Sequence, residues 1–491
     1  MSPDQIGFAI LILGLALLIG KAIRANVRWV QKLFLPSSIL AGVILLLFGP
    51  QVLGQLAGGP LAEAGLYTPG ILETWGTLPG LLISVVFATM FLGQDLPRIG
   101  HAAKLAGPQV SFGLALGSGQ YVIGLLLAIV VLIPLFSASP MVGALIEIGF
   151  EGGHGTAAGM SQVFIDLGFE SGADLAVGLA TVGIVGGIVL GIFLINWAVR
   201  KGHTELLDGQ ADTSVEEQRG LFRKDEHYPA GQMTSRPSSV EPFSLHIAFV
   251  SVAILIGWLI LQGLTWIESV TYGQTEVQDG VTLELMGNVP LFPLALIGGV
   301  ILQAIAKALK FDSLIDAQIM LRIQGLALDF LIVAAIANLS LEAIGENLGV
   351  FVILSIAGIV FNVVMLLVFA PKVIGRFWFE RGIGDFGQSM GVTATGLILM
   401  RITDPEGESP AFEAFGYKQL VFEPFFGGGF VTAMAVPLIF FFGPWPLFIG
   451  MVALFLIAVV GGMLAFGPQA KREHAERAAG DAPYTTSLQK T

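Results

Sequence analysis

The chain has 491 residues, of which 54% are hydrophobic and only 12% are charged, and its mean hydropathy is +0.81. Because soluble domains carry about 25% charged residues, this composition excludes a set of water-soluble domains and predicts a protein embedded in the lipid bilayer. The absence of cysteine excludes disulfides and thiolate sites, and the net charge of −12 leaves no basic surface for nucleic acid.

Eleven long apolar stretches predict membrane-spanning helices. Most are 17 to 29 residues long, which is enough to cross a hydrocarbon core about 30 Å thick at about 1.5 Å per residue. They are apolar on every side, and this favours helices over barrel strands. In chain order the stretches are 6–24, 34–58, 79–95, 108–136, 173–199, 246–268, 290–309, 324–341, 348–371, 419–442 and 445–467.

Two further stretches, 141–166 and 385–403, are rich in Gly, Ala, Ser and Thr, and both contain ionisable residues. We name them the first and second Gly-rich segments. Neither has the composition of a lipid-facing span. Each is therefore predicted to enter the membrane and to return on the same side, as a re-entrant hairpin.

The distribution of basic residues favours this topology. If both Gly-rich segments return on the side from which they enter, all 24 Lys and Arg, including Arg401 and Lys418, fall on the cytoplasmic side. If both segments crossed fully, twelve of them, from Arg200 to Arg381, would lie outside. No basic region precedes the first helix, so we expect it to be uncleaved, with the N-terminus outside and the C-terminus in the cytoplasm.

The same topology predicts an inverted repeat within an all-α membrane protein. Each half has five spans and one Gly-rich segment, and the odd number of spans inverts the second half relative to the first. Inverted halves with broken helices are typical of secondary transporters. The predicted organisation is a first half over 1–200, a cytoplasmic linker over 201–245, a second half over 246–442, an additional C-terminal spanning helix over 443–467 and a polar cytoplasmic tail over 468–491.

The two Gly-rich segments carry the residue types best suited to bind a ligand. Glycine allows close approach of the backbone, and a helix that begins inside the membrane directs free N–H groups at an anion such as a carboxylate. Carbonyls and threonine hydroxyls suit a small hard cation, although small residues also occur simply to allow close helix packing. The predicted substrate-binding residues are Gly152, Gly153, His154, Gly155, Gly387, Gln388, Ser389, Gly391 and Thr395, and the predicted sodium ligands are Thr156, Thr393, Asp329 and Asp385.

Three strings in the chain resemble the bacterial sodium/glutamate symporter family. They are Gly152-Gly-His-Gly-Thr156-Ala-Ala, the Gly-x-Ser-x-Gly-x-Thr-x-Thr run at 387–395, and Phe34-Leu-Pro-Ser-Ser-Ile-Leu-Ala-Gly42. Phe87-Ala-Thr89, with the Gly-Gln-Asp run that follows it, resembles the third helix of the family. The similarity extends over residues 6–442, but Gly384-Asp385-Phe386-Gly387 stands where the second segment of the family opens with Gly-His-Cys-Gly.

The resemblance implies a two-fold inverted repeat with re-entrant hairpins, an inner-membrane homodimer and sodium-driven import of L-glutamate. It also implies an elevator-type movement of a transport domain against a scaffold. Sodium is expected as the coupling ion, with no other cofactor. The chain has no Gly-x-x-x-x-Gly-Lys motif, so ATP is not expected to supply the energy.

The ionisable residues near the Gly-rich segments each have two interpretations. His154 is either part of the site or a packed hydrogen-bonding residue, and Glu151 and Asp385 either neutralise a cation or cap helix N–H groups. Asp329 either takes part in sodium or proton binding or is paired locally. Three others are expected to be ordinary: Glu147 in a solvated outer vestibule, Glu423 in the first turn of a helix, and Arg401 reaching the cytoplasmic surface, with a substrate clamp as its alternative role.

We therefore expect a secondary active transporter, not an enzyme, that imports L-glutamate or a related small carboxylate with sodium by alternating access. The alternatives are transport of another organic anion and coupling to protons. A channel is disfavoured because channels repeat filters or subunits about one axis. An intramembrane enzyme is disfavoured because no His-Glu-x-x-His motif occurs and no base can be assigned to Ser118.

Overall fold

The computed structural model describes residues 3–33, 35–94, 99–206, 219–222, 229–273, 275–278, 281–404 and 407–479. The predictions that concern Phe34, Asp95, Arg98, the linker residues 207–218 and 223–228, and the tail from 480 onwards fall outside these residues.

Long apolar helices build the first half of the chain. Each segment is helical because a helix pairs all its backbone N–H and C=O groups internally, as lipid requires. The helices are α1 (Pro3–Asn26), α2 (Arg28–Lys32), α3 (Ser37–Leu47) continued by η1 (Pro50–Gly54) and α4 (Gln55–Ala57), α5 (Pro69–Thr89), α6 (Ile99–Leu127) continued by η3 (Ala128–Leu132) and α7 (Ile133–Phe136), and α10 (Gly172–Lys201).

The second half follows the same plan and ends in an additional long helix. A short antiparallel hairpin of β1 (Glu276–Gln278) and β2 (Val281–Thr282) follows its first helix. The helices are α12 (Pro242–Val270), α13 (Phe292–Ala308), α14 (Ala317–Ala337), α15 (Leu341–Glu346), α16 (Leu348–Val364) continued by η8 (Met365–Phe369) and α17 (Ala370–Val373), α18 (Trp378–Thr403), α19 (Ala411–Phe422), α20 (Phe430–Phe442), and α21 (Pro444–Leu456) continued by η9 (Ile457–Gly461) and α22 (Gly462–Ala479).

The predicted all-helical membrane architecture is confirmed for the part of the chain that the structure describes. That part contains nine helices long and apolar enough to cross a membrane, together with two shorter apolar helices, α13 and α20. These helices coincide with the predicted apolar stretches.

One helix begins earlier than the sequence suggests. α5 starts at Pro69, whereas the predicted stretch starts at residue 79. Proline is favoured at the first helical position because its missing N–H would be unpaired there in any residue. The added turns are held by Trp75, which is fully buried and donates its indole N–H to the Ala9 carbonyl at 3.1 Å.

The predicted single span over 419–442 is two helices, α19 and α20. The chain breaks between them because Pro424 cannot continue the helical hydrogen bonds, and Gly427 and Gly428 adopt positive φ angles of 67° and 106°. The prediction that Glu423 lies in the first turn of a helix is wrong, since it follows the last residue of α19.

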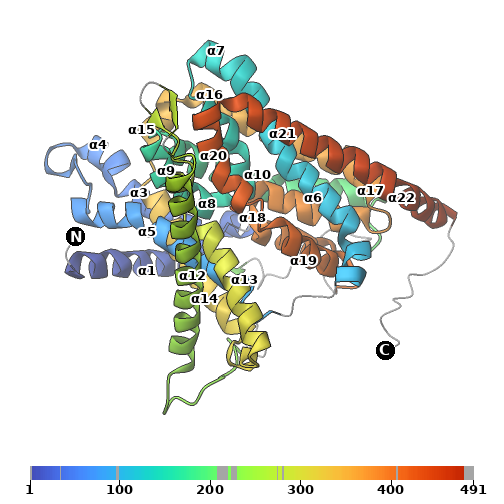
Figure 1. Cartoon of the computed structure of the whole chain (residues 1–491), viewed down its shortest axis with the longest axis horizontal. Coiled ribbons are helices and arrows are strands. Elements are labelled where there is room, and N and C mark those ends of the chain that lie inside the picture. The colour runs from blue at the N-terminus through green and yellow to red at the C-terminus, as the bar shows by residue number, and fades with distance from the viewer. Residues whose placement is uncertain are drawn as a thin grey trace.

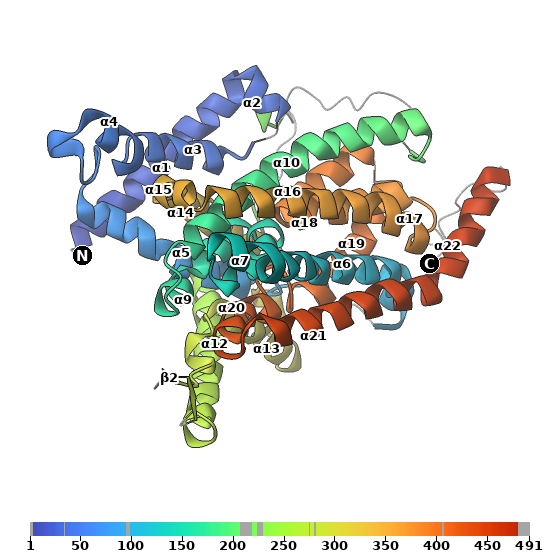
Figure 2. The same cartoon turned by 90° about the horizontal axis from the view of Figure 1, so that it is seen from above.

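The helices form two groups, which Figures 1 and 2 show from two directions. In the first helix group, α1, α3 and α5 pack with α12, α13 and α14, and α5 contacts α14. In the second helix group, α6 contacts α16, α18, α19 and α21, and α10 contacts α18. Figure 2 shows α6, α16 and α21 running side by side. The largest cluster of buried apolar side chains fills the second group and reaches Phe87 of α5 and Leu331 of α14.

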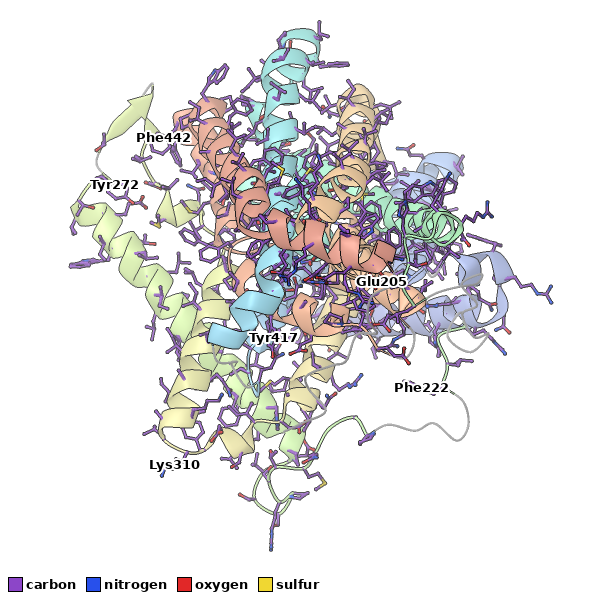
Figure 3. All side chains as sticks on the ribbon, turned by 90° about the vertical axis from the view of Figure 1, so that its right-hand side faces the viewer. Glu205, Phe222, Tyr272, Lys310, Tyr417 and Phe442 are labelled. Atoms are coloured by element: carbon purple, nitrogen blue, oxygen red, sulfur yellow. The ribbon has the colours of Figure 1, made fainter. Side chains whose placement is uncertain are left out.

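α12 and α13 form an antiparallel pair whose opposite ends are marked by Tyr272 and Lys310 in Figure 3. The two helices approach closely because Gly298 has no side chain. A Cβ atom at Gly298 would overlap the carbonyl oxygen of Ala253.

The C-terminal helix continues past the predicted span. α22 runs to Ala479, so residues 468–479 of the predicted tail are helical. Glu473 accepts a hydrogen bond from the backbone N–H of Arg376 at 2.8 Å, and Arg477 donates one to the carbonyl of Thr204 at 2.8 Å. α22 is therefore bonded both to the segment just before α18 and to the segment that follows α10.

Candidate functional site

The two Gly-rich segments are both interrupted helices. The first consists of η4 (Pro140–Ala144), η5 (Glu147–Glu151), α8 (Gly153–Gly159) and α9 (Ser161–Asp166), and Gly153 at its break has a φ of 67°. The second is the greater part of α18, whose helix is broken at Gly391 and Val392, with φ angles of −160° and 63°. Such breaks leave backbone groups without helical partners.

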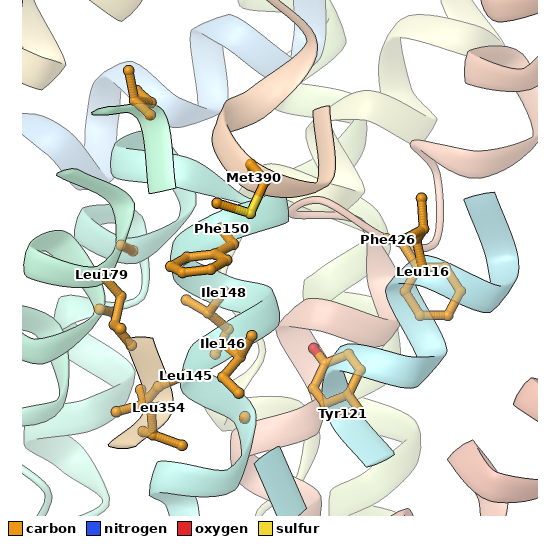
Figure 4. Packing of buried hydrophobic residues seen from close by; sticks show 14 of the residues in the cluster. Leu116, Tyr121, Leu145, Ile146, Ile148, Phe150, Leu179, Leu354, Met390 and Phe426 are labelled. Atoms are coloured by element: carbon orange, nitrogen blue, oxygen red, sulfur yellow. The ribbon is translucent and has the colours of Figure 1, made fainter. Parts of the chain in front are cut away.

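The two breaks touch each other inside the second helix group. A Cβ atom at Gly153 would overlap Cγ1 of Val392, so no larger residue fits between the segments. A Cβ atom at Gly391 would lie 2.7 Å from Cα of Ile184 in α10. Figure 4 shows Phe150 and Met390 from the two segments next to each other beside the break.

Glu147 is a fully buried acceptor at this place. Its carboxylate accepts from the Tyr121 hydroxyl at 2.6 Å, the Gly427 N–H at 2.8 Å and the Thr432 hydroxyl at 2.8 Å. Figure 4 shows the hydroxyl of Tyr121 turned toward the first Gly-rich segment. The prediction of a solvated vestibule residue is wrong, because three donors from α6 and the α19–α20 region satisfy the carboxylate inside the protein.

Lys418 of α19 is also fully buried. Its Nζ donates to Oε1 of Gln388 at 2.6 Å, lies 3.4 Å from Oδ1 of Asp385, and is 3.9 Å from the centroid of the Phe422 ring. Gly113 of α6 makes room for it, because any Cβ there would overlap the Lys418 side chain. The prediction that groups Lys418 with the basic residues of the cytoplasmic surface is wrong, since its charge is paired inside the protein.

Two more carboxylates, the half-buried Glu423 and the buried Glu151, complete the polar cluster. Glu423 accepts from the Thr393 hydroxyl at 3.0 Å and from the amide of Gln419. Glu151 is 2% exposed, and its carboxylate is next to the Ser389 side chain. Glu151 interacts electrostatically with Lys418 of α19 and with Asp385 of the second Gly-rich segment, so these three charged residues are neighbours.

The remaining predicted residues of the first segment lie at the same break. His154 is 2% exposed, and its Nε2 is 2.9 Å from the Thr181 hydroxyl of α10. The hydroxyl of Thr156 is 3.5 Å from the Gly427 carbonyl. Gly155 packs against Ile83 of α5, where a Cβ would meet the Ile83 side chain at 2.9 Å.

The predicted residues of the second segment surround its break. Ser389 is fully buried, and its carbonyl accepts from the amides of Gln120 at 2.6 Å and Asn362 at 3.0 Å. Thr395 donates to the Gly391 carbonyl at 2.5 Å. Gly387 allows the two arms of α18 to touch, because a Cβ there would lie 2.7 Å from Cα of Gly396.

Two residues considered from the sequence are not part of this cluster. Asp329 is exposed on α14, whereas Glu147, Glu151 and Asp385 are buried and Glu423 is half-buried. Arg401 is also exposed, near the end of α18, as expected for a side chain that reaches the membrane surface. The structure thus brings together the predicted residues of the two Gly-rich segments and leaves these two outside.

Sequence reasoning missed several polar partners of the site. Tyr121 and Gln120 are polar residues within the apolar stretch 108–136, and that interruption is the signal that pointed to them. Asn362 interrupts the stretch 348–371 in the same way. Lys418 and Thr432 carried no signal of their own, because their roles depend on contacts with distant segments.

The cluster combines charges of both signs with two helix breaks that touch each other. Among the described residues, no group of three or more His, Cys, Asp and Glu has the arrangement of a metal site. The geometry fits reversible binding of a small charged solute and an alkali cation better than covalent chemistry.

These features define the class of protein. Nine apolar helices of spanning length and a charged interior at broken helices make it a multi-pass membrane transporter. A family model described as sodium/glutamate symporter matches residues 5–403, and the chain belongs to that family, which is one of transporters and not of enzymes. No curated protein matches the chain closely enough to count as a relative. The match ends before α19, so Lys418 and Glu423 lie beyond it.

Proposed function

We propose that this transporter imports L-glutamate or a related small carboxylate together with sodium, by alternating access. The substrate site lies where the two Gly-rich segments meet, and each segment is a re-entrant hairpin from opposite halves of an inverted repeat. The observation that carries this proposal is the contact of the two helix breaks at Gly153 and Val392. Helical turns begin at both breaks, and their free N–H groups suit a carboxylate.

Matching contacts in the two halves support an inverted repeat. α3 packs on α14 just as its proposed counterpart α13 packs on α5. The pairs α1–α14 and α12–α5 correspond in the same way, as do α1–α3 and α12–α13. Such paired contacts are expected when two halves of the same design face each other across a pseudo-two-fold axis.

Contacts within each Gly-rich segment support re-entrant hairpins. In the second segment, a Cβ at Gly384 would overlap the Met400 side chain and a Cβ at Gly396 would overlap the Gly384 carbonyl, so the two arms of α18 lie against each other. In the first segment, η4 and α9 at its two ends both contact α20. A segment that turns back in this way begins and ends on one side of the membrane.

The buried charges support a charged substrate and a coupling cation. Lys418 lies 3.4 Å from Oδ1 of Asp385, and it also bonds Gln388 of the second segment. A substrate carboxylate would be attracted to this ammonium and to the amides at the breaks. The surrounding carboxylates favour uptake of a positive ion at the same time.

Counterflow of labelled glutamate in proteoliposomes tests the proposal. We expect saturable uptake that requires sodium and is inhibited by related dicarboxylates. Gly391→Val should abolish this uptake while the protein still inserts, because a side chain there collides with the backbone of Ile184. Gly450→Val in α21 is the matched control, because a Cβ at Gly450 meets nothing within 4 Å. Equal uptake by the two variants would contradict the assigned site, and uptake driven by protons alone would favour the proton-coupled alternative.

We also propose a homodimer in the bacterial inner membrane, with the N-terminus outside and the C-terminus in the cytoplasm. The chain has no cysteine, so a single introduced thiol reports topology without background. An impermeant maleimide applied to intact cells should fail to label Ser214→Cys in the linker. Labelling at that position from the periplasm would overturn the hairpin topology.

A further inference from the structure

An open pocket of about 500 Å³ lies between the C-terminal end of α10 and the helix α22. This volume is in the range of pockets that hold small ligands. Figures 1 and 2 show α22 crossing beside α17 at this place. The pocket is separate from the two Gly-rich segments, and its lining includes Trp197, His203, Leu367, Trp378, His474 and Arg477.

Three aromatic rings form one wall of the pocket. The centroid of the His203 ring lies 5.0 Å from that of Trp197 and 5.5 Å from that of Trp378. Ring contacts, and no hydrogen bond among the described residues, hold this imidazole in place, so its nitrogen atoms are available to a ligand. Burial, together with the charges of Arg477 and Lys201, lowers the pKa of His203. The imidazole is therefore neutral near pH 7 and offers one N–H donor.

The segments that form the pocket are basic, although the whole chain has a net charge of −12. Residues 197–206, 367–380 and 471–477 together contain seven Lys and Arg but only four acidic residues. The basic residues are Arg200, Lys201, Lys372, Arg376, Lys471, Arg472 and Arg477, and the acidic residues are Glu205, Glu380, Glu473 and Glu476.

Two of these acids bind groups at the start of α18 and in α22. Glu205 lies 2.7 Å from the Arg376 guanidinium and 3.9 Å from that of Arg477. Glu473 accepts from the backbone N–H of Arg376 at 2.8 Å. Glu380 is fully buried below the pocket and accepts from the backbone N–H of Glu205. None of these three carboxylates is therefore directed into the pocket.

Positive charge is left over for a ligand. The last acid, Glu476, pairs with Arg472 at 3.3 Å. Lys201 and Lys372 are exposed, and neither forms an ion pair with a described residue. Nη2 of Arg477 donates to the carbonyls of residues 202 and 204, at 3.0 and 2.8 Å. A guanidinium has five N–H donors, so Arg477 retains donors for an anion.

The pocket opens where two lipid-facing helices leave the membrane. The apolar spans of α10 and of α16–α17 end at Lys201 and Val373. Phe193 is 66% exposed one turn before Trp197, and Val364 is 48% exposed one turn before Leu367. Residues one turn apart share a helix face, so both pocket walls continue into apolar surface that faces acyl chains. Tryptophan is favoured at this boundary between lipid and water.

We propose that this pocket binds the phosphate headgroup of an anionic phospholipid, whose acyl chains lie along Phe193 and Val364. His203 and Arg477 donate to the phosphate, for which arginine is well suited. Basic pockets between membrane helices are known to hold such headgroups. α22 lies beyond the residues that the family model matches, so membership of the family does not imply this site. The inference does not depend on the proposed substrate, and a lipid bound here would join α22 to the start of α18.

Thermal stability in mixed micelles tests the lipid site. The full-length protein is purified in an uncharged detergent, and its Tm is measured against the mole fraction of phosphatidylglycerol or of phosphatidylcholine with the same acyl chains. We expect phosphatidylglycerol to act at a mole fraction roughly tenfold or more below that of phosphatidylcholine. His203→Phe keeps the ring contacts but removes the donor, so it should raise the mole fraction of phosphatidylglycerol for half of the shift by roughly tenfold.

Arg477→Gln should raise that mole fraction by roughly tenfold or more, because it removes the charge that faces the phosphate. Arg322→Gln is the matched control, since Arg322 is exposed on α14 in the first helix group and carries the same charge away from the pocket. This control should keep the wild-type response. If Arg477→Gln does not fold because its bonds to the chain after α10 are lost, His203→Phe still tests the site.

Three results would overturn the lipid site: equal stabilisation by the two lipids, an unchanged response in His203→Phe, or the same Tm shift from inorganic phosphate without lipid. The last result would assign the pocket to a soluble anion. A response to phosphatidylglycerol that depends on His203, in a protein that does not transport glutamate, would support the site and reject the proposed substrate.

Discussion

Replacing Lys418 with methionine is the sharpest probe of the buried site. Methionine keeps the length and apolar stem of lysine but removes the charge that lies 3.4 Å from Asp385. Both side chains are 0% exposed, so Asp385 would lose its ion-pair partner in the interior. Breaking a fully buried ion pair in this way costs about 3–5 kcal/mol, and the loss of the contact with the Phe422 ring adds about 1–2 kcal/mol.

The double variant Lys418→Met/Asp385→Asn tests the cause of that loss. With both charges removed, Asp385 no longer leaves a carboxylate without its ion-pair partner, so the double variant should be more stable than Lys418→Met alone by about 2 kcal/mol or more. The free energy of unfolding would be measured for the wild type, both single variants and the double variant by SDS titration in mixed micelles. If the two single effects simply add, the pair is not coupled and the account of Lys418 as a buried counter-ion fails.

Two further predictions concern the backbone of the site and its support. Gly153→Ala should reduce uptake by roughly 30-fold or more, because a left-handed residue costs about 1–2 kcal/mol and the overlap with Val392 adds about 1–3 kcal/mol. Gly168→Ala is the control, because Gly168 has a similar φ of 72° but a Cβ there would meet no atom within 4 Å. This variant has the same backbone strain without the overlap, so it should retain uptake. A similar loss of uptake in both variants would refute the role of the overlap. Glu205→Ala should lower the free energy of unfolding by about 1.5–3 kcal/mol, because Glu205 binds the Arg376 guanidinium at 2.7 Å. No change in the SDS titration would show that this pair is solvated in the membrane-bound protein.

The sequence predicts the helices well because lipid allows few alternatives. The apolar stretches from 6–24 to 445–467 are helical, except that 419–442 is divided into α19 and α20, since an apolar segment in lipid has to pair its own backbone groups. The Gly-Gly-His-Gly-Thr string also points to the turn at Gly153, because a positive φ favours glycine there. The predicted ends of the helices are less accurate, because polar residues, glycine and proline set them. The helix α5, for example, begins at Pro69 and not at residue 79.

The polar partners of the site could not be predicted in the same way. The positive-inside rule treats every lysine alike, so it assigns Lys418 to the cytoplasmic surface. In the structure, Lys418 is buried within the protein, where it contacts Asp385 and Gln388. Glu147 likewise has an acidic side chain near a predicted loop, but its donors Tyr121 and Thr432 come from distant parts of the chain. Burial of a charge is decided by partners that only the tertiary structure brings together.

The bonds between α22 and the start of α18 constrain how the second Gly-rich segment can be displaced. Arg376, which lies just before α18, bonds Glu473 of α22 and Glu205, which follows α10. Three parts of the chain therefore meet at the start of α18. If the segment were displaced, either α22 would move with it or the hydrogen bond between Arg376 and Glu473 would break. A fluorophore attached near Ala479 would therefore report a displacement of the start of α18 for as long as the Arg376–Glu473 hydrogen bond holds.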